Sequence, residues 1–383
     1  MDLSERIVKQ LIAIIRASFE VSDGEALCIS PELIPQIEAI ASRQSILSIV
    51  VVGLKNLGCS NLITDKMQIH FAKSTYDYIQ RDEALKAISG AFDDSGIDYI
   101  PLKGAALRCL YPQPSMRESS DVDVLVREES LENAVSSLEK FTRFKYYKRA
   151  YHDVHFLNER VHLELHFSLL TNNDGFDRVL SRAWEYASSC GQGYKFAFSP
   201  EYQIFHVVIH AAKHLLEWGG VGIRPLLDLW VLRNKTTYSE STVRLLCKEA
   251  GILDYYDVCC RLLNVWFYGE SHNEITNEFE KLVFSGGVFG SEATKVISQE
   301  RKNLGKKRGY IFTRLFRSKR EIQEFFPRSK KYPILVPFYQ VVRWTHLRSP
   351  AKRKSAQSEL RKRRRLTQEE IDRYDKLLKN LGF

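Results

Sequence analysis

YIPLKGAALRCLYPQPSMRESSDVDVLV, residues 99–126, holds the most informative pattern of this 383-residue chain. It ends in the alternating run Asp121-Val-Asp-Val-Leu-Val126, which predicts a β-strand. Because side chains alternate along a strand, Asp121 and Asp123 share one face and the valines take the other. Two carboxylates at this spacing repel each other, and burying them unpaired costs on the order of several kcal/mol. The pair therefore predicts a bound cation.

A second polar face follows in Val161-His-Leu-Glu-Leu-His-Phe167, where alternation places Glu164 between two histidines. Residues 151–157 and 160–169 read as paired strands around an Asn158-Glu159 turn. If the second of these strands neighbours the aspartate strand, Glu164 becomes a third carboxylate of one site. Three carboxylates suit two Mg²⁺ ions about 3.5–4 Å apart, which activate an attacking oxygen and stabilise leaving pyrophosphate. Oxygen ligands favour Mg²⁺ or Mn²⁺ over zinc.

The residues before the aspartates predict a phosphate-binding half of the same site. Lys103-Gly104 begins an apolar helical pattern, and glycine at a helix start lets the backbone approach a phosphate closely. Lys103 adds a point charge, and Arg117 can hold a phosphate with two donors. Ser120, directly before Asp121, is a further candidate for positioning a triphosphate.

The succession LKGAAL, YPQPSMRESSDVDVLV and VHLELHF resembles the family described as uncharacterised nucleotidyltransferases, within the polymerase-beta-like superfamily. The resemblance implies that Asp121 and Asp123 take the place of the Asp-x-Asp metal ligands, and Glu164 that of the third carboxylate. Lys103-Gly104 takes the place of the turn that holds the triphosphate, where superfamily members commonly carry Gly-Gly or Gly-Ser. HVVIHAAKH, residues 206–214, and the basic C-terminal portion are also similar to the family's layout.

We therefore expect an α+β enzyme with a small mixed β-sheet core flanked by helices. Its expected parts are an N-terminal helical region (1–95), a nucleotidyltransferase core (96–199), a helical domain (200–300) and a basic C-terminal helical segment (301–383). The enzyme would move a nucleoside monophosphate from an NTP, for example ATP, to an unidentified acceptor with Mg²⁺ or Mn²⁺. His166, Lys213 and Asp228 are candidates for the acceptor side of the cleft.

Histidines offer a competing zinc interpretation. His152, His155, His162 and His166 lie on or beside the two later strands, but no cysteine accompanies them and the carboxylates suit a harder ion. His210 and His214 are one helical turn apart, yet the glutamate of a His-Glu-x-x-His metalloprotease is missing. We expect these last two to be core or helix-contact residues.

Charge is distributed unevenly along the chain. The net charge is +9, but residues 301–383 hold 25 Lys and Arg against 7 Asp and Glu, which leaves residues 1–300 at −9. A segment of this kind is a solvated face, or it binds RNA or an anionic membrane surface, although no RNA-binding motif accompanies it. Two other functions therefore stay open: an inactive nucleotide-binding or scaffold protein with a basic docking tail, and an RNA-directed transferase.

The composition favours a cytoplasmic protein. The seven cysteines are scattered and form no Cys-x-x-Cys pair, which is typical of reduced thiols. Residues 1–19 lack the pattern of a secretory signal, and the longest apolar run, 46–54, is far short of a membrane span. We expect neither a signal peptide nor a transmembrane segment.

Overall fold

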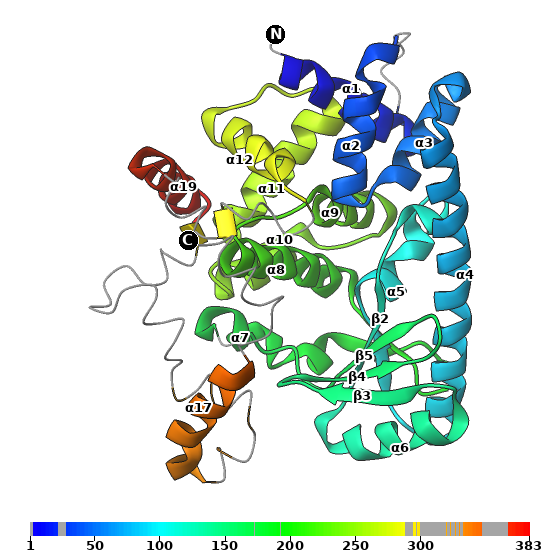
Figure 1. Cartoon of the computed structure of the whole chain (residues 1–383), viewed down its shortest axis with the longest axis vertical. Helices are drawn as coiled ribbons and strands as arrows, with labels where there is room; N and C mark the ends of the chain where they lie inside the picture. Colours follow the sequence, from blue (N-terminus) through cyan, green and yellow to red (C-terminus); the bar gives the residue numbers. More distant parts are fainter. Residues whose placement is uncertain are drawn as a thin grey trace.

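The computed structural model describes residues 3–21, 28–171, 173–191, 193–287, 332–346 and 367–383, together with 294–295, 297–298, 319, 322, 326 and 329. Four helices come first along the chain: α1 (Leu3–Ser18), α2 (Ile34–Gln44), α3 (Leu47–Asn56) and α4 (Asp65–Asp94). Helix α4 begins where the Thr64 side chain accepts a hydrogen bond from the Met67 amide. It runs from the N-terminal helices to the far end of the sheet (Figure 1).

Five strands form one mixed sheet in the order β1-β2-β5-β4-β3. They are β1 (Tyr99–Pro101), β2 (Asp121–Val126), β3 (Lys145–Arg149), β4 (Asp153–Leu157) and β5 (His162–His166). The pair β2–β5 is parallel, and the other three pairs are antiparallel. Helices α5 (Lys103–Leu107), α6 (Leu131–Phe141) and α7 (Asp174–Leu180) and a small β6–β7 pair (Ala187–Ser189, Phe196–Phe198) complete this part. The expected α+β class is confirmed.

The strand register positions the carboxylates. Asp123 lies opposite Glu164 in the parallel pair of β2 and β5, so the predicted neighbourhood of these two strands is confirmed. The predicted pairing around Asn158 is also confirmed, because β4 and β5 are antiparallel with Leu157 opposite His162. The sequence analysis missed β3, whose residues are all exposed and therefore show no apolar alternation.

The two faces of the sheet have different partners. Val122, Val124 and Val126 are buried in one hydrophobic cluster with residues of α4 and α6, which cover that face. Asp121, Asp123 and Glu164 project from the opposite face. The site therefore lies on the side of the sheet that turns away from α4 and α6.

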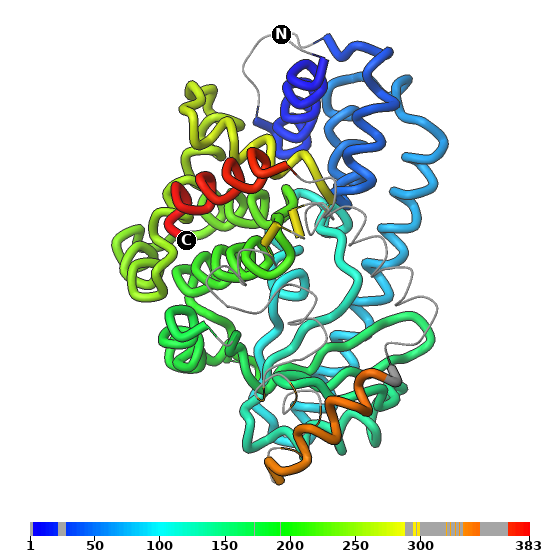
Figure 2. Tube along the Cα trace, turned by 60° about the vertical axis from the view of Figure 1, so that its left-hand side comes forward, coloured from blue at the N-terminus to red at the C-terminus, as the bar shows by residue number. Residues whose placement is uncertain are grey.

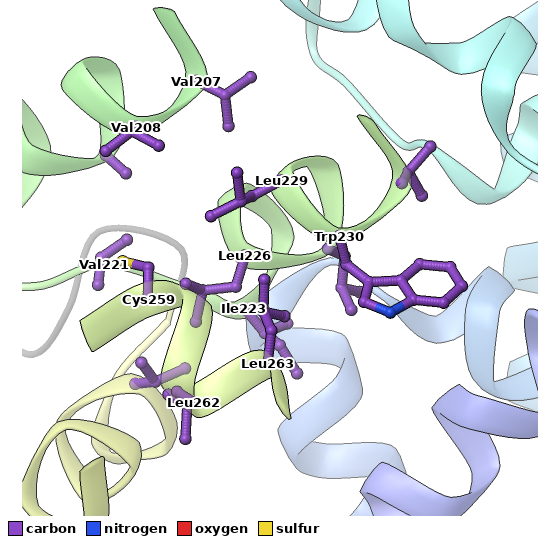
Figure 3. Packing of buried hydrophobic residues seen from close by; sticks show 14 of the residues in the cluster. Val207, Val208, Val221, Ile223, Leu226, Leu229, Trp230, Cys259, Leu262 and Leu263 are labelled. Atoms are coloured by element: carbon purple, nitrogen blue, oxygen red, sulfur yellow. The ribbon is translucent and has the colours of Figure 1, made fainter. Parts of the chain in front are cut away.

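The second half of the chain is helical, with α8 (Pro200–Trp218), α9 (Ile223–Lys235), α10 (Glu240–Glu249), α11 (Leu253–Tyr268) and α12 (Glu274–Ser285). The helices predicted after residue 200 are thus found. Apolar residues of α8, α9 and α11 pack against one another, with Leu226 and Leu229 of α9 between Val208 and Leu262 (Figure 3). Two later helices are described, α17 (Val336–His346) and α19 (Gln368–Asn380), and α19 lies along α12 (Figure 2).

The N-terminal helices and the second half share one hydrophobic core. Phe19, at the end of α1, contacts the rings of Trp230 on α9 and Phe267 on α11. Its ring also lies 5.6 Å from that of Tyr111, in the segment that leads to the aspartate strand. Among the described helices, none is long and apolar enough to cross a membrane.

Candidate active site

A cavity of about 700 Å³ lies between the polar face of the sheet and helices α8 and α9. It is lined by all ten residues that the sequence proposes for metal binding, nucleotide binding or the acceptor side: Lys103, Gly104, Arg117, Ser120, Asp121, Asp123, Glu164, His166, Lys213 and Asp228. The first and last of them, Lys103 and Asp228, are 125 positions apart in the chain. The fold therefore brings the two predicted halves of the site to one place, while the role of each residue stays a prediction.

Asp123 is the most deeply buried carboxylate of the sheet face, with 3% of its side chain exposed. Its Oδ1 accepts a hydrogen bond from Lys103 Nζ at 2.6 Å and lies 3.0 Å from His166 Nε2. Burial alone would raise the pKa of the Asp123 carboxyl, but the Lys103 ammonium and the His166 hydrogen bond outweigh burial and hold that pKa well below its usual range. Asp123 is therefore ionised in the folded protein at neutral pH.

Glu164 has the opposite environment. Burial, followed by the nearby charges of Asp123 and Asp121, raises the pKa of its carboxyl to about 7. Asp123, Glu164 and His166 each place one ligand atom within 4.8 Å of the others. A divalent cation relieves the surplus of negative charge that disfavours ionisation of Glu164. The carboxylate oxygens of Asp123 and Glu164 suit Mg²⁺ or Mn²⁺, whereas the His166 nitrogen does not suit Mg²⁺.

The turn at Lys103 and Gly104 is tightly constrained. Lys103 has a φ of +46°, a left-handed conformation that side chains with a Cβ rarely adopt. A Cβ on Gly104 would lie 3.3 Å from the Ser119 side chain and 3.4 Å from Arg108 Nη2, so the glycine permits this close packing. Helix α5 has only five residues, and its contribution is therefore the backbone approach at Gly104 more than a helix dipole.

Arg108 lies directly behind this turn and was missed by the sequence analysis. Its Nε donates to the Gly104 carbonyl at 2.7 Å, and its Nη2 contacts Ser119 Oγ at 3.3 Å. Burial, then the charges of Arg81 and Arg117, lowers the pKa of Arg108 to about 10. The Arg108 guanidinium therefore adds positive potential behind the glycine turn, which favours a bound anion.

Arg117 and Asp228 form a buried pair across the cavity. Arg117 Nε and Nη2 donate to the two oxygens of Asp228 at 2.6 and 2.7 Å, and the Tyr111 hydroxyl also donates to Asp228 at 2.6 Å. Arg117 Nη1 donates to the Glu118 carbonyl. The two donors of Arg117, which the sequence predicted to bind a phosphate, thus bind a carboxylate in this structure. The pair ties the loop before β2 to α9.

Helix α8 presents a row of histidines to the cavity at four-residue spacing, namely His206, His210 and His214. Burial, with the Lys103 charge second, lowers the pKa of His206 to about 3 and that of His214 to about 4, and it lowers the pKa of His210 in the same direction. These imidazoles are therefore neutral near pH 7. His210 and His214 were expected in helix contacts, and the structure places both on the cavity wall.

Arg224 completes this wall. Its Nη1 donates to the Glu118 carbonyl at 2.7 Å, whereas its Nε is buried and has no hydrogen-bond partner among the described residues. Burial and the neighbouring Arg117 lower the pKa of Arg224 to about 10.

A second cavity of about 280 Å³ shares Lys103, His166 and Lys213 with the first and extends toward Leu169, Leu170 and Ile209. The chemistry of the wall is that of a binding site with one polar, cationic part and one apolar part.

Comparison with known proteins finds a family match that covers the residues of the cavity. The model of a family described as uncharacterised nucleotidyltransferases matches residues 31–268, more than half of the chain and all of the cavity's strands and of helices α8 and α9. No curated protein and no solved structure matches the chain. By the extent of the family match, the chain belongs to the uncharacterised nucleotidyltransferase family.

Proposed function

We propose that this protein transfers a nucleoside monophosphate from an NTP to an acceptor hydroxyl at Asp121, Asp123 and Glu164. The observation that carries the proposal is the parallel register of β2 and β5, which sets Asp123 opposite Glu164 on the cavity floor. Family membership supports the reaction class. In this reaction the acceptor oxygen bonds to the α-phosphorus, the bond to the β-phosphate oxygen breaks, and pyrophosphate leaves.

Asp121, Asp123 and Glu164 would hold the divalent ions, for which Mg²⁺ or Mn²⁺ suits the oxygen donors. When bound, such ions polarise the phosphoryl oxygens and lower the pKa of the attacking group. Glu164, on the acceptor side, takes up the proton of the acceptor hydroxyl. Asp123 is already fixed by Lys103 and His166, so its orientation is set before substrate arrives.

The triphosphate would lie against the Lys103-Gly104 turn and Ser120. Arg108 supports this turn from behind and adds positive potential without reaching the cavity lining. Arg117 positions the loop before β2 through Asp228. Arg224 Nε, which has no hydrogen-bond partner among the described residues, and the Lys213 ammonium offer further donors for the anionic substrate on the α8–α9 wall.

We also propose ATP as the donor, a cytoplasmic location and the four-part division of the chain. RNA or an anionic membrane surface is proposed as a partner of the basic C-terminal segment. Much of that segment, including the Arg361–Arg365 run, lies outside the described residues. The alternative function is that of an inactive nucleotide-binding scaffold, which would bind NTP without transferring any part of it.

The reaction class is tested by the position of the label. Purified protein is incubated with Mg²⁺, each NTP labelled at the α- or the γ-phosphate, and a small-molecule extract as the source of acceptor. We expect the α-label to enter a product and the γ-label to leave in pyrophosphate. Transfer of the γ-label alone would indicate a phosphotransferase instead, and nucleotide binding without either transfer would favour the scaffold.

A further inference from the structure

Two histidines outside the cavity lining converge with Glu164 on the same face of the sheet. His155 on β4 lies opposite Glu164 in the antiparallel pair, and His162 precedes Glu164 by two residues on β5. His155 Nδ1 is 2.9 Å from His162 Nε2 and 3.7 Å from Glu164 Oε1. The ligand atoms of all three residues lie within 4.8 Å of one another.

Asp153 lies beside the first of these histidines. Its Oδ1 is 2.7 Å from His155 Nε2, outside hydrogen-bond geometry, and a carboxylate this close favours a proton on Nε2. With the proton on Nε2, the Nδ1 lone pair is the donor that faces His162 and Glu164. A carboxylate that holds the outer nitrogen of a histidine is the usual outer contact of a metal-binding imidazole. The group therefore has an inner ligand set and a carboxylate in contact with the outer nitrogen of one imidazole.

The structure also separates the four histidines that the sequence grouped together. His166 contacts Asp123, and the ring of His152 lies against Tyr151. His155 and His162 instead form a pair with rings within 11° of parallel. Their two nitrogens and the Glu164 oxygen make a three-ligand set that suits Zn²⁺ with one open position. Tetrahedral zinc needs its ligand nitrogens about 3.3 Å apart, so the pair has to open by only a few tenths of an ångström.

We propose that His155, His162 and Glu164 bind a transition-metal ion of the Zn²⁺ class, in a site that shares Glu164 with the proposed Mg²⁺ site. One carboxylate cannot orient fully toward both sites. Occupancy by Zn²⁺ therefore draws Glu164 away from Asp123 and inhibits nucleotidyl transfer. This inhibition rests on the proposed function, whereas metal binding itself does not.

Binding is tested with Co²⁺, whose visible absorption reports a tetrahedral nitrogen-containing site. Full-length protein is titrated with Co²⁺ in excess Mg²⁺, which fills the carboxylate site. We expect one equivalent of Co²⁺ to produce the bands, and Zn²⁺ to abolish them.

His162 is the residue to substitute because 29% of its side chain is exposed, so His162→Gln is expected to fold, as checked by circular dichroism. His152→Gln is the matched control, a histidine beside β4 that is outside the ligand set.

The proposal requires the bands to be lost in His162→Gln and kept in His152→Gln. Asp153→Asn should weaken Co²⁺ binding by about 10–100-fold, as loss of an outer contact does. Asp123→Asn should keep the bands while it removes transfer, so failure of this proposal and failure of the proposed function are separable. Absence of the bands in the unmodified protein, their persistence in His162→Gln, or their loss in Asp123→Asn would each overturn the proposal.

Discussion

At the scale of single residues, the sequence singled out the carboxylates of the site and the cations Lys103 and Arg117, but not Arg108 or His206. Alternation placed Asp121 and Asp123 on one face of their strand, because strand geometry is local. That Glu164 joins them depends on the parallel pairing of β2 and β5, which the structure supplies. Arg108 and His206 gave no such signal. Their place depends on how α5 and α8 pack against the sheet, which is a long-range property of the fold.

The buried pair of Arg117 and Asp228 gives the first residue-scale prediction. Asp228→Asn leaves the Arg117 guanidinium buried without its counter-charge, so the free energy of unfolding should fall by about 3–5 kcal/mol. Asp257→Asn is the control, because Asp257 pairs with Arg244 where both side chains are more than a third exposed. Its loss should be about 0–1 kcal/mol. Urea denaturation measures both values, and equal losses would contradict the account.

At the scale of elements, the loop before β2 is attached to the N-terminal helices through Glu118. This carboxylate contacts His70 Nε2 on α4 at 3.0 Å and accepts a hydrogen bond from the Ser48 hydroxyl on α3. The hydrogen bond with Glu118 raises the pKa of His70. Burial opposes ionisation of Glu118, but its contacts with His70 and Ser48 outweigh burial and lower its pKa. Helices α3 and α4 thus hold the segment that leads into the aspartate strand.

This attachment predicts a pH dependence of stability. His70 contributes stability below its unfolded pKa of about 6.5, and the contribution is lost as pH rises through its higher folded pKa. The Glu118 contribution is present above its unfolded pKa of about 4.3 and is lost as pH falls through its lower folded pKa. The pair is therefore most stabilising at about pH 5–6. His70→Gln should lower the melting temperature more at pH 5.5 than at pH 8.5.

A double-mutant design makes this pH prediction specific. In a Glu118→Gln background, His70→Gln should have a similar effect at both pH values, because the charge partner is gone. A pH-dependent loss that persists without Glu118 would show that another group controls His70.

The packing of α1 on α3 gives a second element-scale prediction. A Cβ on Gly53 would lie 2.0 Å from the Ile14 backbone oxygen, so the two helices would have to move apart. Gly53→Ala should therefore destabilise the protein by about 1–3 kcal/mol. Gly90→Ala is the matched control inside α4, where nothing lies within 4 Å of the added Cβ, and it should stabilise by up to about 1 kcal/mol. Destabilisation by both substitutions would contradict the packing argument.

At the scale of the whole molecule, the sequence predicted the helices of both ends but not their association. The sequence predicted helical regions at 1–95 and 200–300, yet apolar spacing carries no information on which apolar faces meet. In the structure Phe19 joins α1, α9 and α11 behind the cavity. Tyr111, which contacts both Phe19 and Asp228, connects this shared core to the site.

The shared core predicts that Phe19 stabilises both halves together. Phe19 is 6% exposed, and Phe19→Ala should lower the free energy of unfolding by about 3–5 kcal/mol in a single cooperative transition. Calorimetry and near-UV circular dichroism should report the same midpoint. Two separate transitions, with only one of them moved by Phe19→Ala, would mean that the N-terminal helices and α8–α12 unfold independently.

The Asp123 carboxylate on β2 is proposed to serve metal-dependent nucleotidyl transfer, and a single substitution can remove it. Transfer of the α-label from NTP in the presence of Mg²⁺ is compared between the unmodified protein, Asp123→Asn and Asp98→Asn. Asp98 pairs with Arg127 away from the cavity lining and serves as the control. We predict that Asp123→Asn reduces transfer to background while Asp98→Asn leaves it unchanged. Full transfer by correctly folded Asp123→Asn would contradict the account.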